Sequence, residues 1–526
     1  MEKRALIAVA ISFTILLVYQ FFLAPKESPQ IQPPAHLEEK EKAAPVQTNE
    51  QDVLVSMPKT VSADVKEIKV ETEFYTAVFS SLGGTIKHYE LNAYKEKNGG
   101  NVVLLKDPGV IPPLGIGSKD DFNLAATNFS VAGSDLILNK NNPDGSLVFQ
   151  YSGSGISVKR TYTFTNGTYR IDIKDEVSGA PEYWITVGAN FGVYDTKDAT
   201  VHTGPVVLKG TDRMEFDTKK LAEPTTLKGD IKWVAQEDKY FFASLVPLSP
   251  VEEAKVWQYA DSPLTALKTK SGTNSFILFA GPKEYERLKT LNVGLEHIVD
   301  FGFFSIIAVP LFWVLKFFYN LTGNYGWAII LLTLITRIPF IPLINKSQKS
   351  MKKMQELQPR MAELREKYKK DPQKLQQEMM GLYKSHKVNP VGGCLPMLLQ
   401  IPVFFALYKI LLIAIELRSA PFMLWIQDLS APDTLFGHIP AVLPLIGGFA
   451  VGPLPIVMGI TMVIQQKMTP TSLDPAQNRI MMLMPVIFTF LFLNFASGLV
   501  LYWLMNNIFS IVQQLYVNKK AAREQT

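Results

Sequence analysis

Residues 326–343 read GWAIILLTLITRIPFIPL, an apolar run with one permanent cation, Arg337, well inside it. Crossing the hydrocarbon core of a bilayer takes about twenty apolar residues in a helix that rises ~1.5 Å per residue. Counted from Asn324 and from Lys346, Arg337 lies ~20 Å from the outer end of the run and ~13 Å from the inner end. A central arginine costs ~2.5–3.5 kcal/mol to insert. The stretch therefore predicts a membrane-spanning helix with a polar site around Arg337.

The rest of the chain separates into a half typical of soluble proteins and an apolar half. Lys3 and Arg4 precede about twenty apolar residues, which predicts an uncleaved signal-anchor span at 1–24 with a cytoplasmic N-terminus. Residues 25–60 are rich in proline and charge and almost free of aromatic residues, so they are predicted to be a disordered linker. The chain has one cysteine, Cys394, which excludes an internal disulfide.

Residues 61–299 carry the alternating apolar and polar pattern of β-strands. In SVKRTYTFTNGTYRIDIKDEV, residues 157–177, the alternation on both sides of Asn166–Gly167 predicts a hairpin with a type I′ turn. Gly83–Gly84 predicts a second turn between strands. Many short strands of this kind predict a large all-β sandwich outside the cytoplasm. Near 282–298 the pattern becomes helical.

The distribution of charged residues predicts the membrane topology of the apolar half. Residues 346–393 hold 12 Lys or Arg and 5 Asp or Glu, a net charge of +7 (12 − 5), and such a segment belongs in the cytoplasm. If residues 300–323 crossed the membrane, this segment would lie outside, so 300–323 are predicted to form an interfacial amphipathic helix. Span 2 then covers 324–345. Spans 3 to 6 lie within 394–518, and the break between the last two is predicted at Asn494–Gly498.

The cytoplasmic segment has a pattern of its own. Apolar residues recur at helical spacing on both sides of Asp371–Pro372, which predicts a basic helical hairpin with a methionine-rich seam. The seam is either a packing face between the two helices or a surface that adapts to hydrophobic partners. Its predicted members are Met354, Leu357, Met361, Leu364, Tyr368, Leu375, Met379 and Leu382. The short tail, 519–526, is predicted to be cytoplasmic.

The predicted spans offer Arg337 no suitable carboxylate. Spans 2, 4, 5 and 6 contain no Asp or Glu, and span 3 has only Glu416, at its opposite end. Water and neutral side chains remain as the groups that could stabilise the charge of Arg337. Those in the cytoplasmic halves of the spans are Thr333, Gln400, Gln465, Gln466, Asn506, Asn507, Ser510, Gln513 and Gln514. They predict either amide bonds between helices or a hydrated groove that opens to the cytoplasm and is closed to the outside.

A positive groove that reaches only part of the way through the bilayer suits neither a channel nor a proton-coupled transporter. It suits a short hydrophilic stretch of another protein, above all an acidic one, which Arg337 would attract. The client's apolar helix would slide into lipid along spans 3 and 5, driven by hydrophobic burial. The candidate slide residues are Met397, Phe404, Phe405, Phe488, Phe490 and Phe492. We expect no catalytic residue, metal or cofactor, and no phosphate-binding GxxxxGK[ST] motif occurs.

Five stretches carry a resemblance to the YidC family of bacterial membrane protein insertases, in its Gram-negative form. They are NYGWAIILLTLITRIPFIPLINKSQKSMKKMQELQP, NPVGGCLPMLLQIPVFFALYK, IELRSAPFMLWIQDLS, MPVIFTFLFLNFASGLVLYW and NNIFSIVQQ. The resemblance implies a polytopic α-helical protein with six spans, a five-helix insertase core, a periplasmic β-sandwich and a cytoplasmic hairpin, in the inner membrane. It implies Arg337 as the groove charge. It implies as polar partners Thr333, Gln400, Asn506 and Gln513, and as an aromatic pair Tyr502 and Trp503.

The resemblance also implies partners. These are nascent membrane proteins delivered by ribosomes and the signal recognition particle pathway, the Sec translocon and the phospholipid bilayer, with no direct nucleic-acid binding. Two features depart from the family's pattern. Lys409 puts a charge in span 3, with Glu416 as its nearest candidate partner, and the short tail leaves ribosome contact to loops 346–393 and 467–479. A membrane-anchored periplasmic binding protein or chaperone and a small secondary transporter are the alternative functions.

Overall fold

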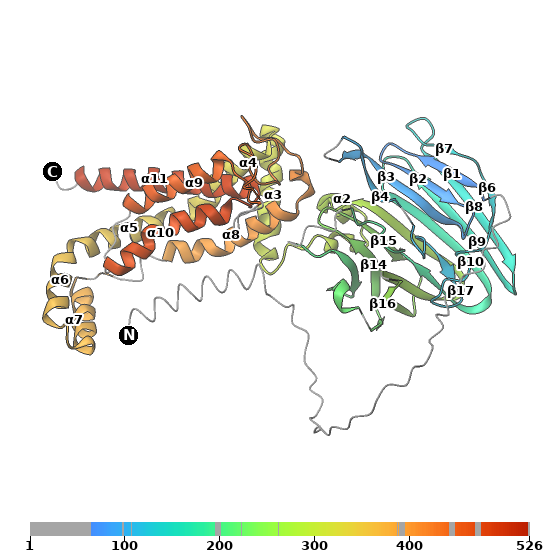
Figure 1. Ribbon diagram of the computed structural model, residues 1–526, viewed down its shortest axis with the longest axis horizontal. Helices are drawn as coiled ribbons and strands as arrows, with labels where there is room; N and C mark the ends of the chain where they lie inside the picture. The colour runs from blue at the N-terminus through green and yellow to red at the C-terminus, as the bar shows by residue number, and fades with distance from the viewer. Residues whose placement is uncertain are drawn as a thin grey trace, which may run out of the picture.

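The chain folds as a strand-rich half and a helical half, which lie side by side in Figure 1. The computed structural model describes residues 65–96, 99–106, 108–194, 201–221, 223–260, 262–386, 388, 395–440, 448–468 and 475–523. The predicted signal anchor, the linker, the middle of the predicted inner loop and the end of the tail lie outside the described residues.

Two β-sheets make up the strand-rich half. Among the described residues, the first sheet has five strands in the order β4-β3-β2-β1-β7. Its strands are β1 (Glu67–Glu71), β2 (Tyr75–Ser80), β3 (Thr85–Lys95), β4 (Asn101–Leu105) and β7 (Leu136–Ile137). Gly83 and Gly84, with φ of 69° and 59°, form the turn from β2 to β3 and so confirm that prediction.

The second sheet has 12 strands among the described residues, and nine of them run in the order β12-β11-β14-β15-β17-β10-β9-β8-β6. They are β6 (Ser130–Ala132), β8 (Asp144–Gly153), β9 (Ile156–Thr165), β10 (Arg170–Thr186), β11 (Gly204–Lys209), β12 (Asp212–Glu215), β14 (Ile231–Glu237), β15 (Phe241–Pro247) and β17 (Ser262–Pro282). β5 (Ile116–Gly117), β13 (Thr225–Lys228) and β16 (Glu253–Tyr259) pair at the side of this path. The expectation of short strands fails for β10 and β17, which have 17 and 21 residues. A register shift between Val177 and Glu182 divides their long pairing into two stretches.

The hairpin predicted at Asn166–Gly167 forms, but its turn is of another type. β9 pairs antiparallel with β10, and Phe164 lies opposite Ile171. The connection therefore runs from Asn166 to Tyr169, and only Gly167 in it has a positive φ, of 76°. A type I′ turn needs two residues with positive φ, so the predicted turn type was wrong. The strand pattern fixed the register, and the Asn-Gly pair did not.

The two sheets pack against each other and bury a core rich in aromatic residues. Phe79 of the first sheet lies 4.8 Å from Tyr162 of the second, measured between ring centroids. Arg160 and Asp175 form a fully buried ion pair, with Nε to Oδ1 and Nη2 to Oδ2 both at 2.7 Å. This packing is that of a β-sandwich.

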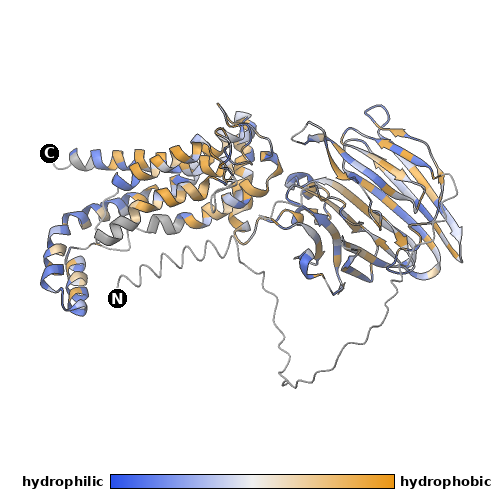
Figure 2. Cartoon of the chain, viewed as in Figure 1, coloured by the Kyte–Doolittle hydropathy of each residue, from blue (hydrophilic) through white to orange (hydrophobic). Residues whose placement is uncertain are grey.

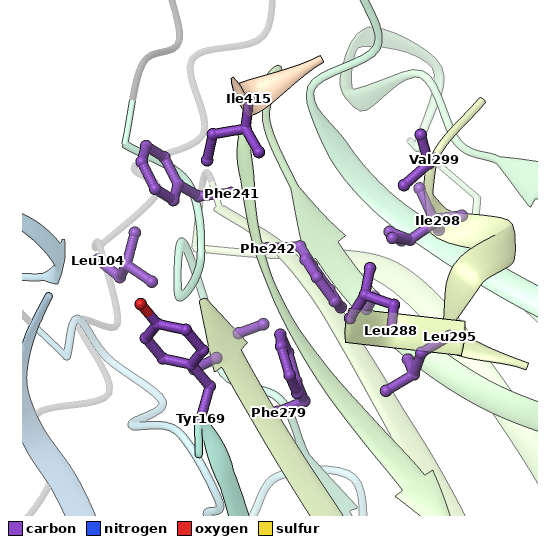
Figure 3. Packing of buried hydrophobic residues seen from close by; sticks show 14 of the residues in the cluster. Leu104, Tyr169, Phe241, Phe242, Phe279, Leu288, Leu295, Ile298, Val299 and Ile415 are labelled. Atoms are coloured by element: carbon purple, nitrogen blue, oxygen red, sulfur yellow. The ribbon is translucent and has the colours of Figure 1, made fainter. Parts of the chain in front are cut away.

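The junction between the two halves is apolar. The short helices α2 (Tyr285–Thr290) and η3 (Leu295–Ile298) place Leu288, Leu295 and Ile298 against the second sheet. Figure 3 shows Ile415, from the helical half, beside Phe241 of β15. All five residues belong to one continuous buried cluster, so the β-sandwich and the helical half share a core.

The helical half begins with α3 (Ser305–Thr322), which lies across the end of the other helices nearest the β-sandwich in Figure 1. α4 (Tyr325–Arg337), η4 (Ile338–Phe340) and α5 (Ile341–Glu356) follow without a gap. The helix predicted to end with span 2 at 345 therefore continues to Glu356. The remaining long helices are α8 (Leu395–Ile413), α9 (Pro453–Met468), α10 (Pro475–Phe492) and α11 (Ser497–Arg523).

Figure 2 shows apolar residues concentrated in this bundle and polar ones in α6 and α7. Among the described residues, Ser305–Thr322 and Tyr325–Glu356 are long and apolar enough to cross a membrane, and 400–413 and 481–492 are shorter apolar helices. Length and composition alone would let α3 cross the membrane, whereas the basic charge of residues 346–393 predicts that α3 lies along the surface. The number of spans thus stays a prediction.

The basic segment forms α6 (Gln358–Lys367) and α7 (Pro372–Ser385). The continuous helix predicted before Asp371 is interrupted at Leu357, because Pro359 favours the start of a new helix. Met354, Leu357, Met361 and Val388 form a small buried cluster, with Met379, Leu382 and Tyr383 packed on it. Leu364, Tyr368 and Leu375 from the predicted seam lie outside that cluster.

Candidate functional site

Arg337 lies at the joint between α4 and α5. Pro339 and Pro342 lie near the starts of η4 and α5, where the absence of an amide hydrogen is tolerated. The α4 helix ends at Arg337, and a cation in the last turn interacts favourably with the helix dipole. The guanidinium points to α11.

Neutral groups of α11 bind the guanidinium. Nη1 donates to both the backbone oxygen and Oδ1 of Asn506, each at 2.8 Å. Nη2 donates to Ser510 Oγ at 2.8 Å and to Gln513 Oε1 at 3.3 Å, and Nε donates to Gln513 Oε1 at 3.4 Å. Asn506, Ser510 and Gln513 share one face of α11, because their spacing of four and three residues matches the helical turn.

The polar site extends one step further. Gln513 Nε2 donates to Asn345 Oδ1 at 2.8 Å, so the amide that accepts from Arg337 also ties α11 to α5. Arg337, Asn506, Ser510 and Gln513 are all half-exposed. Among the described residues, no carboxylate lies within ion-pair distance of Arg337. The site is therefore a cation held by neutral groups. Ser510 was in the predicted polar set but not among the named partners, and its position four residues after Asn506 could have identified it.

Three other predicted groove residues have different partners. Thr333 is buried, and its hydroxyl donates to the Ile329 oxygen of its own helix at 2.7 Å. Asn507 is buried and donates to Thr461 Oγ1 of α9 at 3.1 Å. Gln400 Nε2 donates to the Tyr502 hydroxyl at 3.4 Å, which links α8 to α11. Asn507 thus forms the kind of bond between helices that was the alternative to a groove.

Trp503 is the centre of an aromatic cluster. Its ring centroid lies 5.0 Å from that of Phe404, 5.8 Å from that of Phe488 and 5.2 Å from that of Phe492. Three predicted slide residues, from α8 and α10, therefore pack on one side chain of α11. Phe492 is 2% exposed and cannot contact a client in this conformation. The side chain of Met397 lies outside the described part of the structure.

The exposed apolar face of α10 includes neither Phe488 nor Phe492. Its members are between 38% and 57% exposed, and they are Met481, Met482, Leu483, Val486, Ile487, Phe490 and Leu491. Phe490 was a predicted slide residue, and it lies on the face opposite Phe488 and Phe492. The helical period of α10 could have separated Phe490 from the other two.

Lys409 has a partner that the sequence did not suggest. Its Nζ lies 3.2 Å from Asp300 Oδ2, just before α3. Glu416, the partner expected for Lys409, instead lies 3.4 Å from Lys316 of α3. The expected pairing of Lys409 with Glu416 was wrong, because α3 and the residues just before it pass beside α8 and supply both counter-charges.

These features define a helical membrane protein with a large β-sandwich at one end and a cationic polar site inside its bundle. Residues 67–314 match the model of the YidC periplasmic domain, and residues 317–524 match that of the 60Kd inner membrane protein family. Membrane protein insertase YidC of Syntrophus aciditrophicus is 40% identical over 99% of this chain and 100% of its own length. That of Pelobacter propionicus is 41% identical over 99% of both chains.

A crystal structure of an active YidC insertase with its first transmembrane domain resolved also matches, at 21% identity, 97% and 99% coverage and a TM-score of 0.38. The relatives that are similar over their full length show that the chain belongs to the YidC family of membrane protein insertases. It is an insertase of the inner membrane, with a β-rich periplasmic domain and a helical C-terminal region.

Proposed function

We propose that Arg337 and its neutral partners form the floor of a hydrated groove that receives a polar segment of the client. The observation that carries this proposal is that, within the part of the chain that the structure describes, Arg337 is bound by Asn506, Ser510 and Gln513, through oxygen atoms that carry no net charge. The positive charge is therefore solvated but not neutralised. A segment with Asp or Glu would gain a counter-charge that the described part of the protein does not provide.

The same groove lowers the cost of bringing polar groups into the bilayer. An unpaired polar group in hydrocarbon costs several kcal/mol, ~2–7 for an amide or hydroxyl, and the half-exposed amides of α11 offer it hydrogen bonds. The client's apolar helix then leaves the groove between α8 and α10 and enters lipid. Burial at ~25 cal/mol per Å² drives this step, so no nucleotide is needed.

The groove requires the topology predicted from charge. Six spans place both termini and the basic segment with α6 and α7 in the cytoplasm, and the β-sandwich in the periplasm. The 12 basic residues of 346–393 then face the anionic surface of a ribosome, and loop 467–479 adds to them. In this proposal clients arrive from ribosomes and the signal recognition particle pathway, and the protein acts alone or beside the Sec translocon.

The test uses vesicles that contain only this protein and a single-span client with an acidic translocated segment. Arg337→Glu should slow insertion by about tenfold or more, because a charge pair in an intermediate dielectric is worth ~1–4 kcal/mol. Arg337→Lys should keep most of the activity, since the charge rather than the guanidinium shape attracts the client. Insertion is measured as protection of the translocated segment from protease.

Two controls make the result specific. Lys219→Glu makes the same change of net charge at an exposed position of the β-sandwich, between β12 and β13, and should leave insertion unchanged. A client whose acidic residues are replaced by Asn or Gln should lose the dependence on Arg337. If Arg337→Glu inserts the acidic client as fast as the parent does, the electrostatic mechanism is wrong.

A further inference from the structure

The two halves of α8 differ in how tightly they are packed. Residues 406–413, at the end nearest the β-sandwich, are mostly buried, whereas 400–405 are all half-exposed. Pro402 lies between these exposed residues and removes one backbone hydrogen bond from the helix there. The half of α8 nearest the β-sandwich, called here the outer half, is therefore the more rigid one.

An ion pair holds the outer half to the start of α3. Lys409 Nζ lies 3.2 Å from Asp300 Oδ2, and the Gly302 amide donates to Asp300 Oδ1 at 2.9 Å. Burial raises the pKa of the Asp300 carboxyl, but Lys409, Arg213 and the hydrogen bond from the Gly302 amide together outweigh that effect, so the pKa lies below its ordinary value. Asp300 therefore stays charged at neutral pH and remains a partner for Lys409.

Two further contacts fix the same end. Lys316 of α3 lies 3.4 Å from Glu416. Arg418, which follows the short helix η6 (Ile415–Leu417) after α8, donates to the Lys95 backbone oxygen of β3 at 2.9 Å, and its guanidinium lies 5.5 Å from the centroid of the Phe241 ring. The outer half of α8 is thus tied both to α3 and to the β-sandwich.

The inner half meets α11 through weaker contacts. Gln400 donates to the Tyr502 hydroxyl at 3.4 Å, and Phe404 packs edge-on against Trp503. A client's apolar side chains can replace an aromatic contact. They offer no counter-charge to Lys409 or Asp300, whose side chains are 33% and 42% exposed.

We propose that Asp300 and Lys409 are positioning residues that make the outer half of α8 a fixed pivot, about which the inner half moves away from α11 to admit a client. The proposal rests on the proposed function, because it assigns a movement to one wall of the same groove. Asp300 and Lys409 act on the client only through the placement of α8.

Cross-linking tests the movement. Cysteine pairs are introduced with Cys394→Ser, at Phe404 with Trp503 for the inner contact and at Tyr408 with Phe495 for the outer one. The outer pair is a matched control, since Tyr408 and Phe495 also join α8 to the neighbouring helices, with ring centroids 5.9 Å apart. For each variant, the rate of client insertion is measured in vesicles before and after a short bifunctional thiol reagent is added.

The inner cross-link should stop insertion, and the outer cross-link should leave the rate of that variant unchanged. Equal effects of the two cross-links, in either direction, would overturn the pivot. Loss of activity in the parent vesicles without Sec components would instead count against the proposed function, so the two failures are distinguishable.

Charge reversal tests the positioning pair. Lys409→Asp places two carboxylates together, and Asp300→Lys places two ammonium groups together, so each should slow insertion by about fivefold. The double exchange, Asp300→Lys with Lys409→Asp, restores an ion pair and should recover most of the parent rate. A double exchange as slow as the single variants, or single variants as fast as the parent, would show that the pair positions nothing.

Discussion

Gly459 of α9 faces Thr489 of α10 at very short range. A Cβ added at Gly459 would lie 2.0 Å from Thr489 Oγ1, and that hydroxyl is held by a 2.7 Å bond to the Pro485 oxygen. Small residues allow such close approach between helices in membranes. Gly459 is therefore needed for the packing of α9 on α10.

We expect Gly459→Ala to destabilise the detergent-purified protein by ~1–3 kcal/mol, the usual cost of overpacking. The measurement is the midpoint of thermal unfolding. Gly381→Ala in α7 is the control, because nothing lies within 4 Å of its added Cβ, and there alanine should be neutral or stabilising. Equal midpoints for the two variants would contradict the close approach.

The polar residues of α11 also show what a single position decides. Asn506 and Asn507 are neighbours in the sequence, yet they face different helices. Asn506 binds Arg337, and Asn507 bonds to Thr461 of α9. Each residue turns ~100° about the helix axis, so adjacent amides cannot share a neighbour. The sequence identified both residues as polar within a span, but the two roles depend on the orientation of α11.

At the scale of elements, α7 depends on the capping residue just before it. Asp371 precedes Pro372, and its side chain accepts from the Lys374 amide at 3.1 Å, which is an N-terminal cap. The apolar cluster that joins α7 to α5 and α6 is small. Local caps therefore matter more here than in the bundle.

We expect Asp371→Ala to destabilise α7 by about 1 kcal/mol, because the cap is lost. Hydrogen exchange of the α7 amides should become about fivefold faster, while exchange in α11 stays the same. Asp371→Ser keeps a capping oxygen and should exchange at nearly the parent rate. Unchanged exchange in Asp371→Ala would mean that packing alone holds α7.

At the scale of the whole molecule, the chain passes from the β-sandwich into the bundle between η3 and α3, and Asp300 lies in this connection. Deletion of residues 65–298 removes the β-sandwich together with α2 and η3, but leaves Asp300 beside Lys409. We expect this variant to insert a test client nearly as fast as the parent, because the groove lies in the helical half and the pairs Asp300–Lys409 and Lys316–Glu416 remain when the contact of Arg418 with Lys95 is lost. A deletion of residues 65–303 removes Asp300 as well, and should insert several-fold more slowly.

Both deletions are compared in vesicles at equal amounts of membrane-embedded protein. Equal rates would mean that Asp300 does not position α8. Complete loss of activity in the shorter deletion would favour the alternative in which the β-sandwich is the working part.

The amino-acid sequence by itself determined the two halves, the β-sandwich, the basic hairpin and the isolated arginine. It did so because alternation, hydropathy and charge are local properties that each segment carries wherever it packs. The predicted slide residues show what the sequence by itself did not determine. Phe488 and Phe490 are equally apolar, but only the packing of α10 on Trp503 turns one inward and the other outward.

The tertiary structure alone decided which charges meet. The sequence predicted that Lys409 pairs with Glu416, which is close along the chain, but α3 passes beside α8, and Lys409 pairs with Asp300 and Lys316 with Glu416. Arg337 likewise donates to Ser510, which lies more than 170 residues later in the chain. Ion pairs and hydrogen bonds depend on distances of a few ångströms, and those distances are set by how the helices cross.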